Sequence, residues 1–186
     1  IAAARAAGLG VKINMVVQRG VNDGEILSIA RHCKREGIVL RFIEFMDVGN
    51  SNHWDPAMVV SGREILDRLA REFAFEPVRP GAYGEVAARY RYRDDGCEFG
   101  LITSISSPFC RDCTRARLSA DGRLFTCLFA SEGFDLVGAM RADNLDDEAL
   151  YRLVAGLWSR RADRYSEIRA ESAGGAPKVE MSFIGG

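Results

Sequence analysis

Three cysteines in the second half of the chain have the residue type and spacing to bind a metal. Cys110 and Cys113 form a C-x-x-C pair in a loop, and Cys127 follows on the far strand of the next expected hairpin. The short spacing lets two thiolates bind one centre, and the hairpin would fold the third thiolate back toward them. The pattern predicts a metal centre with three thiolate ligands.

The identity of that metal depends on a fourth ligand. Structural zinc sites have four protein ligands, and Cys97 is the candidate because it is expected on the neighbouring antiparallel strand. His32 and His53 fit less well, since they fall on a helix and in a distant loop. If Cys97 is instead a small buried hydrophobe, three thiolates and an open position suit a [4Fe–4S] cluster. A zinc-stapled binding module that uses Cys97 stays open as the alternative.

Two arginines follow the C-x-x-C pair directly. Strand alternation over residues 114–118 places Arg115 and Arg117 on the same face. Adjacent guanidinium groups fit phosphates or a planar polar base, which they bind through paired N–H donors. The alternative is an exposed edge strand on which the arginines contribute only solubility.

The first part of the chain predicts a βαβ unit. Residues 11–17 and 38–46 are expected to be strands, with a helix between them that follows Asn22-x-x-Glu25, a sequence like a capping box, and ends at Gly37. The strands should be parallel neighbours joined by a right-handed crossover. Ligands gather at the carboxyl ends of such strands, so residues 47–54 are a candidate wall of a site.

The pattern changes to antiparallel sheet after Pro77. Before it, Ser61-x-x-Glu64 predicts the capped start of a helix that runs to about Phe73. Alternating stretches then occur at 87–93, 99–104, 114–118 and 123–128. Asp121-Gly122 predicts a hairpin between the last two stretches. Two short helices are expected at 136–140 and 146–158.

The composition excludes several classes of protein. The chain has 186 residues, 47% of them apolar, and a net charge of −1, so it lacks the positive field that would hold nucleic acid or an anionic membrane surface. No apolar run approaches the roughly 18–20 residues that span a bilayer. Five cysteines are an odd number in a chain that is not disulfide-dense, which is typical of a reducing, cytoplasmic location.

The start of the chain resembles the last turns of a helix. Ile1-Ala-Ala-Ala-Arg-Ala-Ala-Gly8 ends on a glycine, has no N-cap residue and lacks an initiator Met. We therefore expect the chain to be cut from a larger protein.

A set of short motifs along the whole chain resembles one known family. The motifs are Lys12-Ile-Asn14, Arg41-Phe-Ile-Glu44-x-Met46, Ser107-Pro-Phe-Cys110-x-x-Cys113-x-Arg115-x-Arg117-Leu, Ala120-Asp-Gly122, Cys127-Leu-Phe129 and the terminal Gly185-Gly186. They are similar to those of the radical S-adenosylmethionine enzymes of molybdenum cofactor biosynthesis, the GTP 3′,8-cyclases.

The resemblance implies an α/β fold with an incomplete (β/α) barrel and two [4Fe–4S] clusters. In the family, an N-terminal cluster held by C-x3-C-x2-C cleaves S-adenosylmethionine to a radical that abstracts H-3′ from GTP, and the ribose carbon then attacks C8 of guanine. The second cluster holds the guanine. Residues 1–75 would be the last βαβ units of a truncated barrel, and residues 76–186 an antiparallel α+β cluster-binding domain with a Gly-Gly tail.

The resemblance also implies partners. The full-length enzyme would be a cytoplasmic homodimer that takes GTP as substrate and works in a pathway with the cyclic pyranopterin monophosphate synthase.

The resemblance assigns roles to residues of this chain. The ligands of the second cluster would be Cys110, Cys113 and Cys127. The contacts to GTP would come from Lys12, Arg115, Ala116 and Arg117, with Ala116 contributing at most its backbone. Arg41 would act on the substrate or intermediate, and Met46 would line the S-adenosylmethionine site. Gly185 and Gly186 would reach into the active site, where the small, permissive backbone of glycine fits.

The chain departs from the family pattern in one respect. It contains no C-x3-C-x2-C, so the radical-generating half is missing and the chain alone should be inactive.

Strict alternation places Arg41 and Met46 on opposite faces of a strand, which must end or bulge between them if both line the site. Another radical enzyme with an auxiliary cluster, such as a peptide maturase, is a second enzyme interpretation, although those enzymes tend to carry more C-terminal cysteines.

Overall fold

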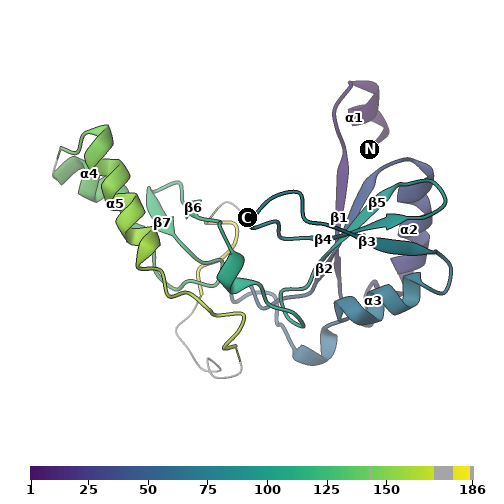
Figure 1. The fold of residues 1–186 in the computed structure, drawn as a ribbon. Helices are drawn as coiled ribbons and strands as arrows, with labels where there is room; N and C mark the ends of the chain where they lie inside the picture. The colour runs from purple at the N-terminus through teal and green to yellow at the C-terminus, as the bar shows by residue number, and fades with distance from the viewer. Residues whose placement is uncertain (143, 170–177, 185–186) are drawn as a thin grey trace. The chain divides into compact units, whose positions relative to one another are not determined.

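Figure 1 shows the fold in a computed structural model, which describes residues 1–142, 144–169 and 178–184. The chain forms two compact units. Unit 1 comprises Ile1–Met46 and Trp54–Phe109, and unit 2 comprises Asp47–His53 and Cys110–Gly186. In the described part of the chain, no helix is both long and apolar enough to cross a membrane.

Unit 1 is built on a mixed five-stranded sheet of order β1-β2-β5-β4-β3. The strands are β1 (Lys12–Val17), β2 (Val39–Glu44), β3 (Phe75–Val78), β4 (Ala88–Tyr92) and β5 (Glu98–Ile102). The predicted parallel pairing of the first two strands is confirmed, with Asn14 opposite Arg41. β5 pairs parallel with β2 and antiparallel with β4, so the strands on both sides of Pro77 form one sheet. The fold is mixed α/β as predicted, and the described strands form no closed barrel.

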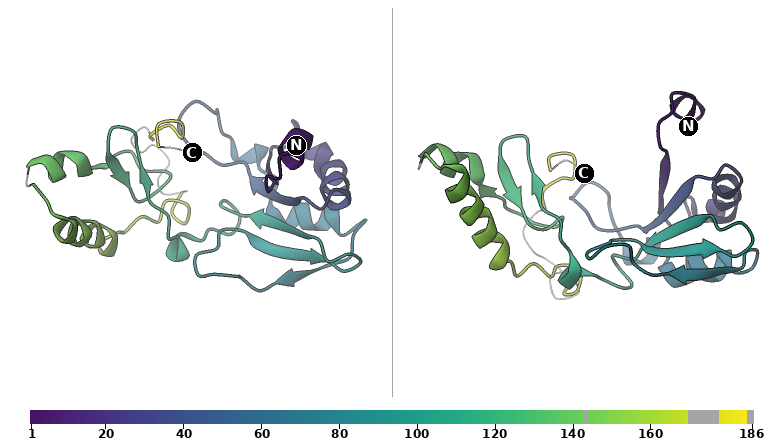
Figure 2. Two further views of the ribbon diagram at one scale, coloured as in Figure 1. Left: turned by 90° about the horizontal axis from the view of Figure 1, so that it is seen from above. Right: turned by 45° about the horizontal axis from the view of Figure 1, so that its top comes forward.

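Helices cover one face of this sheet. α2 (Ile26–Arg35) and α3 (Gly62–Leu69) carry amphipathic patterns, and their apolar residues form a single core with alternate residues of β1, β2 and β5. Val17, Phe42 and Phe99 are almost fully buried in it. Figure 2 shows the ribbons of the two helices beside the sheet. The opposite face carries the other half of each alternation, with Lys12, Asn14 and Arg41 among its residues.

The two predicted capping boxes have different outcomes. At α3, Ser61 Oγ accepts a hydrogen bond from Glu64 N at 3.2 Å and the Glu64 carboxylate accepts one from Ser61 N at 3.1 Å, so this box is confirmed. The helix ends at Leu69, before the expected Phe73. The box at Asn22 is wrong: its amide hydrogen-bonds Gln18 N and Val16 O instead. A 3-10 turn, η1 (Asp23–Glu25), then leads into α2.

Unit 2 contains a three-stranded antiparallel sheet of order β6-β7-β8. Its elements are η3 (Cys110–Asp112), β6 (Arg117–Leu118), β7 (Arg123–Phe125), β8 (Phe134–Asp135), α4 (Leu136–Ala142) and α5 (Asp147–Ser159). The Asp121-Gly122 hairpin is confirmed, since β6 pairs with β7 and Gly122 has φ +82°. A Cβ at Gly122 would also lie 2.1 Å from Val137 Cγ2, which restricts the position to glycine.

The Ser61 capping box provides a stability prediction. Replacing Ser61 with Ala removes the acceptor of the Glu64 amide, so the free energy of unfolding should fall by about 1 kcal/mol. Urea unfolding followed by circular dichroism measures this. Ser61→Thr keeps the hydroxyl that accepts from the Glu64 amide and donates to the Glu64 carboxylate, so it should stay near the original stability. Equal losses in both variants would mean that the cap is unimportant.

Candidate functional site

The three predicted metal ligands lie in unit 2 around a short turn and a hairpin. Cys110 opens η3, and Cys113 N donates to Cys110 O at 3.3 Å to close the turn. Cys127 lies two residues beyond the end of β7, and its Sγ accepts a hydrogen bond from Phe129 N at 3.4 Å. All three side chains are partly buried and none is in a disulfide. Two thiols come from one turn, and the third comes from the end of the hairpin that follows it.

The electrostatics of the thiols differ from one cysteine to the next. Burial raises the pKa of the Cys113 thiol, but hydrogen bonds from Arg115 and the positive charges of Arg115 and Arg161 outweigh it, so the pKa lies below its ordinary value. Burial raises the pKa of the Cys127 thiol, and the charges of Asp163 and Cys110 add to the rise.

The fit of these cysteines to a metal rests on the chemistry of the donors. Among the described residues, no three or more Cys, His, Asp or Glu side chains are already arranged around an ion position. Thiolate is nonetheless the ligand that iron–sulfur clusters take, and Cys113 is held in conditions that favour its thiolate. The donor set fits a cluster with three cysteine ligands.

Arg115 and Arg117 share one side of the segment that follows Cys113. Cys113, Arg115 and Arg117 are partly buried, whereas the alternate residues Thr114, Ala116 and Leu118 are exposed. The predicted common face therefore agrees with the burial, although the regular strand β6 begins only at Arg117. Burial and the charge of Arg115 lower the pKa of the Arg117 guanidinium. Two crowded cations with this pKa direction form a position that a bound anion would stabilise.

Lys12 and Arg41 lie on the face of the unit 1 sheet that α2 and α3 leave uncovered. Lys12 pairs with Val39 and Asn14 pairs with Arg41, so Lys12, Asn14 and Arg41 project to the same side. Arg41 is also opposite Gly100 of β5, where a Cβ would lie 3.4 Å from Arg41 Cγ. The glycine gives the Arg41 side chain room to lie along the sheet.

The strand that carries Arg41 ends before Met46. β2 ends at Glu44, so strict alternation does not extend to Met46, and the expected interruption is an ordinary strand end.

A residue without a predicted role, Glu44, is nearly fully buried at this end of the strand. Its carboxylate accepts hydrogen bonds from the amides of Gly62 at 2.7 Å, Ile105 at 2.8 Å and Ser106 at 2.9 Å, and from the Ser106 hydroxyl. Glu44 lies in the motif Arg41-Phe-Ile-Glu44-x-Met46. The signal that could have identified its role is a carboxylate at a position that strand alternation places in the apolar core.

A second buried carboxylate, Asp47, organises part of unit 2. It accepts hydrogen bonds from Tyr165 Oη at 2.7 Å, Arg169 Nε at 2.9 Å and Lys178 Nζ at 2.7 Å. Tyr165 stacks on Phe129 with ring centroids 4.7 Å apart, and Lys178 Nζ lies 4.5 Å from the Tyr165 ring centroid. Asp47, the first residue of the segment 47–54 that was predicted as a site wall, thus connects to the chain beyond Cys127.

The remaining cysteines belong to unit 1. Cys33 is buried in the core, as predicted. Cys97 packs against the same core, its Sγ is 3.9 Å from Lys34 O, and burial raises the pKa of its thiol. Cys97 is partly buried, and these contacts are those of a thiol packed at the edge of the core. Gly185 and Gly186 lie outside the described residues.

Asp47 provides a prediction on pH. Burial alone would raise the pKa of Asp47, but hydrogen bonds from Lys178 and Tyr165 and the charge of Arg169 lower it below its ordinary value. Its stabilisation is therefore present above the ordinary Asp pKa of about 4 and is lost as the pH falls through the lower folded-state value. Asp47→Ala should cost about 3 kcal/mol at pH 7, as for one partner of a buried ion pair.

Urea unfolding at pH 7 and at acidic pH measures both effects. Asp47→Asn should show a smaller loss of stability on acidification than the original chain. Asp147→Asn, at an exposed position in the first turn of α5, is the control and should change little. Identical acid dependence in the original chain and Asp47→Asn would contradict the role of this carboxylate.

Comparison with known proteins identifies relatives along the whole chain. Residues 38–167 match the family described as Molybdenum Cofactor Synthesis C. The chain is 47% identical over 212 residues to the GTP 3′,8-cyclase of Acidothermus cellulolyticus, and the match covers 100% of this chain and 58% of that protein. It is 49% identical over 183 residues to the GTP 3′,8-cyclase of Staphylococcus carnosus, covering 96% of this chain and 54% of that protein.

The chain therefore spans little more than half the length of the curated relatives it matches. The resemblance seen in the short motifs is confirmed, because the family match includes the three cysteines, the two arginines and Arg41. The chain belongs to the Molybdenum Cofactor Synthesis C family.

Proposed function

We propose that this chain is the substrate-binding portion of a GTP 3′,8-cyclase, the enzyme that converts GTP to (8S)-3′,8-cyclo-7,8-dihydroguanosine 5′-triphosphate by radical S-adenosylmethionine chemistry. The observation that carries the proposal is the grouping of Cys110, Cys113, Cys127, Arg115 and Arg117 in one unit of a member of this family. The grouping combines donors for a cluster with donors for a nucleotide.

The three cysteines would hold a [4Fe–4S] cluster through their thiolates. When bound, the cluster supplies an open iron that holds the guanine of GTP. The lowering of the Cys113 pKa below its ordinary value supports this role, because a thiolate is the ligating form. The packing of the partly buried Cys97 against the unit 1 core supports three ligands over a four-cysteine zinc site.

The arginines would bind the nucleotide beside the cluster. Arg115 and Arg117 offer planar guanidinium groups that form paired hydrogen bonds to phosphate or base oxygens. An anion would offset the burial and mutual repulsion that lower the pKa of Arg117. Ala116 is exposed between them and would contribute at most its backbone.

The uncovered sheet face of unit 1 would contribute the other polar contacts. Lys12 would contact GTP, and Arg41 would act on the substrate or intermediate. The parallel register that sets both on one face supports this assignment. Met46, just beyond the end of β2, would line the S-adenosylmethionine site, and Gly185 and Gly186 would reach the active site.

Radical formation would require a segment that this sequence does not contain. The chain has no C-x3-C-x2-C, so cleavage of S-adenosylmethionine at a second [4Fe–4S] cluster belongs to the full-length enzyme. In that enzyme, residues 1–75 would be the end of an incomplete barrel and residues 76–186 the cluster-binding domain. The full-length enzyme would be a homodimer that works with the cyclic pyranopterin monophosphate synthase.

The metal provides the first functional prediction. This chain, reconstituted anaerobically, should carry about four irons and absorb broadly near ~400 nm, as thiolate-ligated clusters do. Cys127→Ala should abolish both signals because it removes one of three ligands. Cys97→Ala is the control and should leave both intact. Stoichiometric zinc that is lost in Cys97→Ala would replace the proposal with the zinc module.

The arginines provide the second functional prediction. In the full-length enzyme, replacing Arg115 or Arg117 with Ala should weaken GTP binding by roughly 1.5–3 kcal/mol, the range for charge-assisted hydrogen bonds. Lysine should restore only part of the affinity, because a point charge does not reproduce the paired donors. Isothermal titration calorimetry measures both.

A neighbouring arginine is a matched control for this test. Arg111 lies on η3 with a side chain that is 77% exposed, and Arg111→Ala should leave GTP affinity nearly unchanged. If the Arg115 and Arg117 double variant binds GTP normally, the two arginines serve only an exposed strand.

A further inference from the structure

A third arginine, Arg161, contacts the backbone of the cysteine turn. It lies two residues beyond the end of α5, and its side chain is only 11% exposed. Nη1 donates to Cys113 O at 2.5 Å, and Nη2 donates to Cys110 O at 3.5 Å. One guanidinium therefore spans both ends of the turn that carries two of the three predicted ligands.

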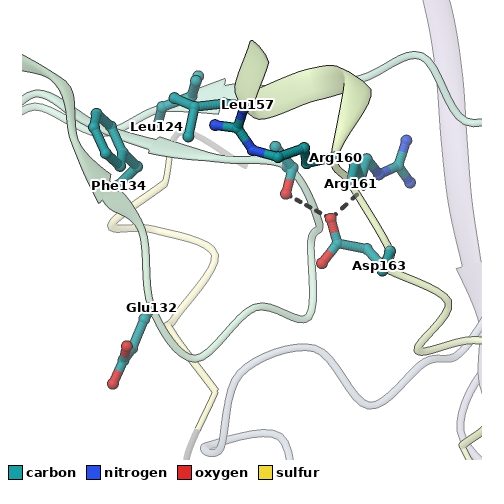
Figure 3. Close-up of a pocket in the computed structure, with 9 residues that line it drawn as sticks. Leu124, Glu132, Phe134, Leu157, Arg160, Arg161 and Asp163 are labelled. Carbon is teal, nitrogen blue, oxygen red and sulfur yellow. Dashed lines mark hydrogen bonds and ion pairs between the residues drawn. The ribbon is translucent and has the colours of Figure 1, made fainter. Parts of the chain in front are cut away.

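Asp163 extends this contact to the third cysteine. Its carboxylate accepts hydrogen bonds from Arg161 Nε at 3.2 Å and from Thr126 Oγ1 at 2.5 Å. Figure 3 shows the two dashed lines meeting at Asp163. Thr126 directly precedes Cys127, so a single chain of hydrogen bonds joins the carbonyl oxygens of Cys110 and Cys113 to the side chain of the residue beside Cys127.

The Arg161 side chain is also fixed from the α5 side. Its guanidinium carbon lies 4.8 Å from the centroid of the Trp158 ring, a distance at which a cation is attracted to the ring face. Figure 3 shows Arg160 and Arg161 side by side along a cavity of about 330 Å³. Arg160 is exposed, whereas Arg161 is held by the turn, Asp163 and Trp158.

We propose that Arg161 and Asp163 are positioning residues for the cluster ligands, with Arg161 also supplying a nearby positive charge. The inference rests on the proposed function, since it requires a cluster on Cys110, Cys113 and Cys127. The contacts are made to carbonyl oxygens and to Thr126, so they orient the backbone and leave each sulfur available for iron.

The charge has a second consequence for the cluster. The arginine guanidinium is a cation. Net charge and neighbouring hydrogen bonds set the reduction potential of iron–sulfur clusters, and a nearby cation stabilises the more negative, reduced state. Asp163 carries the opposite charge 3.2 Å from Arg161 Nε, so loss of Arg161 would leave that carboxylate unneutralised beside the cluster. Arg161 would therefore keep the potential higher than it would be in its absence, as well as holding the turn.

The test uses this chain, reconstituted anaerobically with iron and sulfide. Arg161→Met removes both the donors and the charge, so a chelator should extract iron about 10- to 100-fold faster, the usual effect of losing a partner that orients metal ligands. The midpoint potential of the cluster, measured by redox titration with electron paramagnetic resonance, should fall. Arg161→Lys should restore the potential but not the slow iron release, because lysine keeps the charge and lacks the planar set of donors.

Two further variants keep the test decisive. Arg160→Met changes a neighbouring exposed arginine and should match the original chain in both measurements. Thr126→Val keeps the side-chain shape and removes only the hydrogen bond to Asp163, so it should release iron faster without a shift in potential even if Arg161→Met does not fold.

The possible failures are distinguishable. If the original chain carries a cluster and Arg161→Met and Thr126→Val both release iron at the original rate, the positioning role is overturned. An unchanged potential in Arg161→Met would overturn the electrostatic role. If the original chain never binds iron while Cys97→Ala alters a bound zinc, the proposed function fails first, and this inference fails with it.

Discussion

The arrangement of unit 1 depends on one buried carboxylate. Glu44 ends β2 on the side of the sheet that faces the core, and burial of its charge is tolerable only if donors replace water. Those donors are the amide at the start of α3 and two amides in the loop after β5. The carboxylate thus ties together a strand end, a helix start and the loop that leads toward Cys110. The start of α3 also lies close to the segment after β5, because a Cβ at Gly62 would be 2.4 Å from Thr103 Cγ2.

The two faces of the unit 1 sheet differ in role: one packs the hydrophobic core, and the other carries the candidate substrate contacts. The helix-covered face is apolar and aromatic, with Tyr90 stacked on Phe99 at 5.2 Å between ring centroids. The uncovered face carries Lys12 and Arg41, together with Arg89 in an ion pair to Glu98 at 2.6 Å. Long cationic side chains are costly in a core but stable on such a face. The candidate substrate contacts therefore lie on the face that takes no part in the hydrophobic core.

Unit 2 is stabilised by a different balance of interactions. Among its described residues the buried apolar side chains are few, and Phe125, Phe129, Leu136 and Ile184 account for them. Polar groups take a larger part: Asp47 joins three donors, and Arg161 joins the cysteine turn to Asp163. Small domains with little core commonly rely on a metal for folding energy. A cluster on the three cysteines would complete a unit that hydrophobic burial alone stabilises weakly.

Local patterns in the sequence by themselves determined the parallel strand pair, the Ser61 cap, the Asp121-Gly122 hairpin and the shared side of Arg115 and Arg117. The cap, the hairpin and the shared side follow from spacing within a few residues, where backbone geometry and side-chain direction are nearly fixed. The parallel pair follows from the strand–helix–strand order, because such units pair their strands in parallel. Only the tertiary structure decided the partners of Glu44, Asp47 and Arg161, because those contacts join residues far apart along the chain. The same limit explains the Asn22 error, since the amide found partners in the preceding strand end. Periodicity reports which way a side chain points, but the partner that satisfies a buried charge is chosen by how distant segments pack.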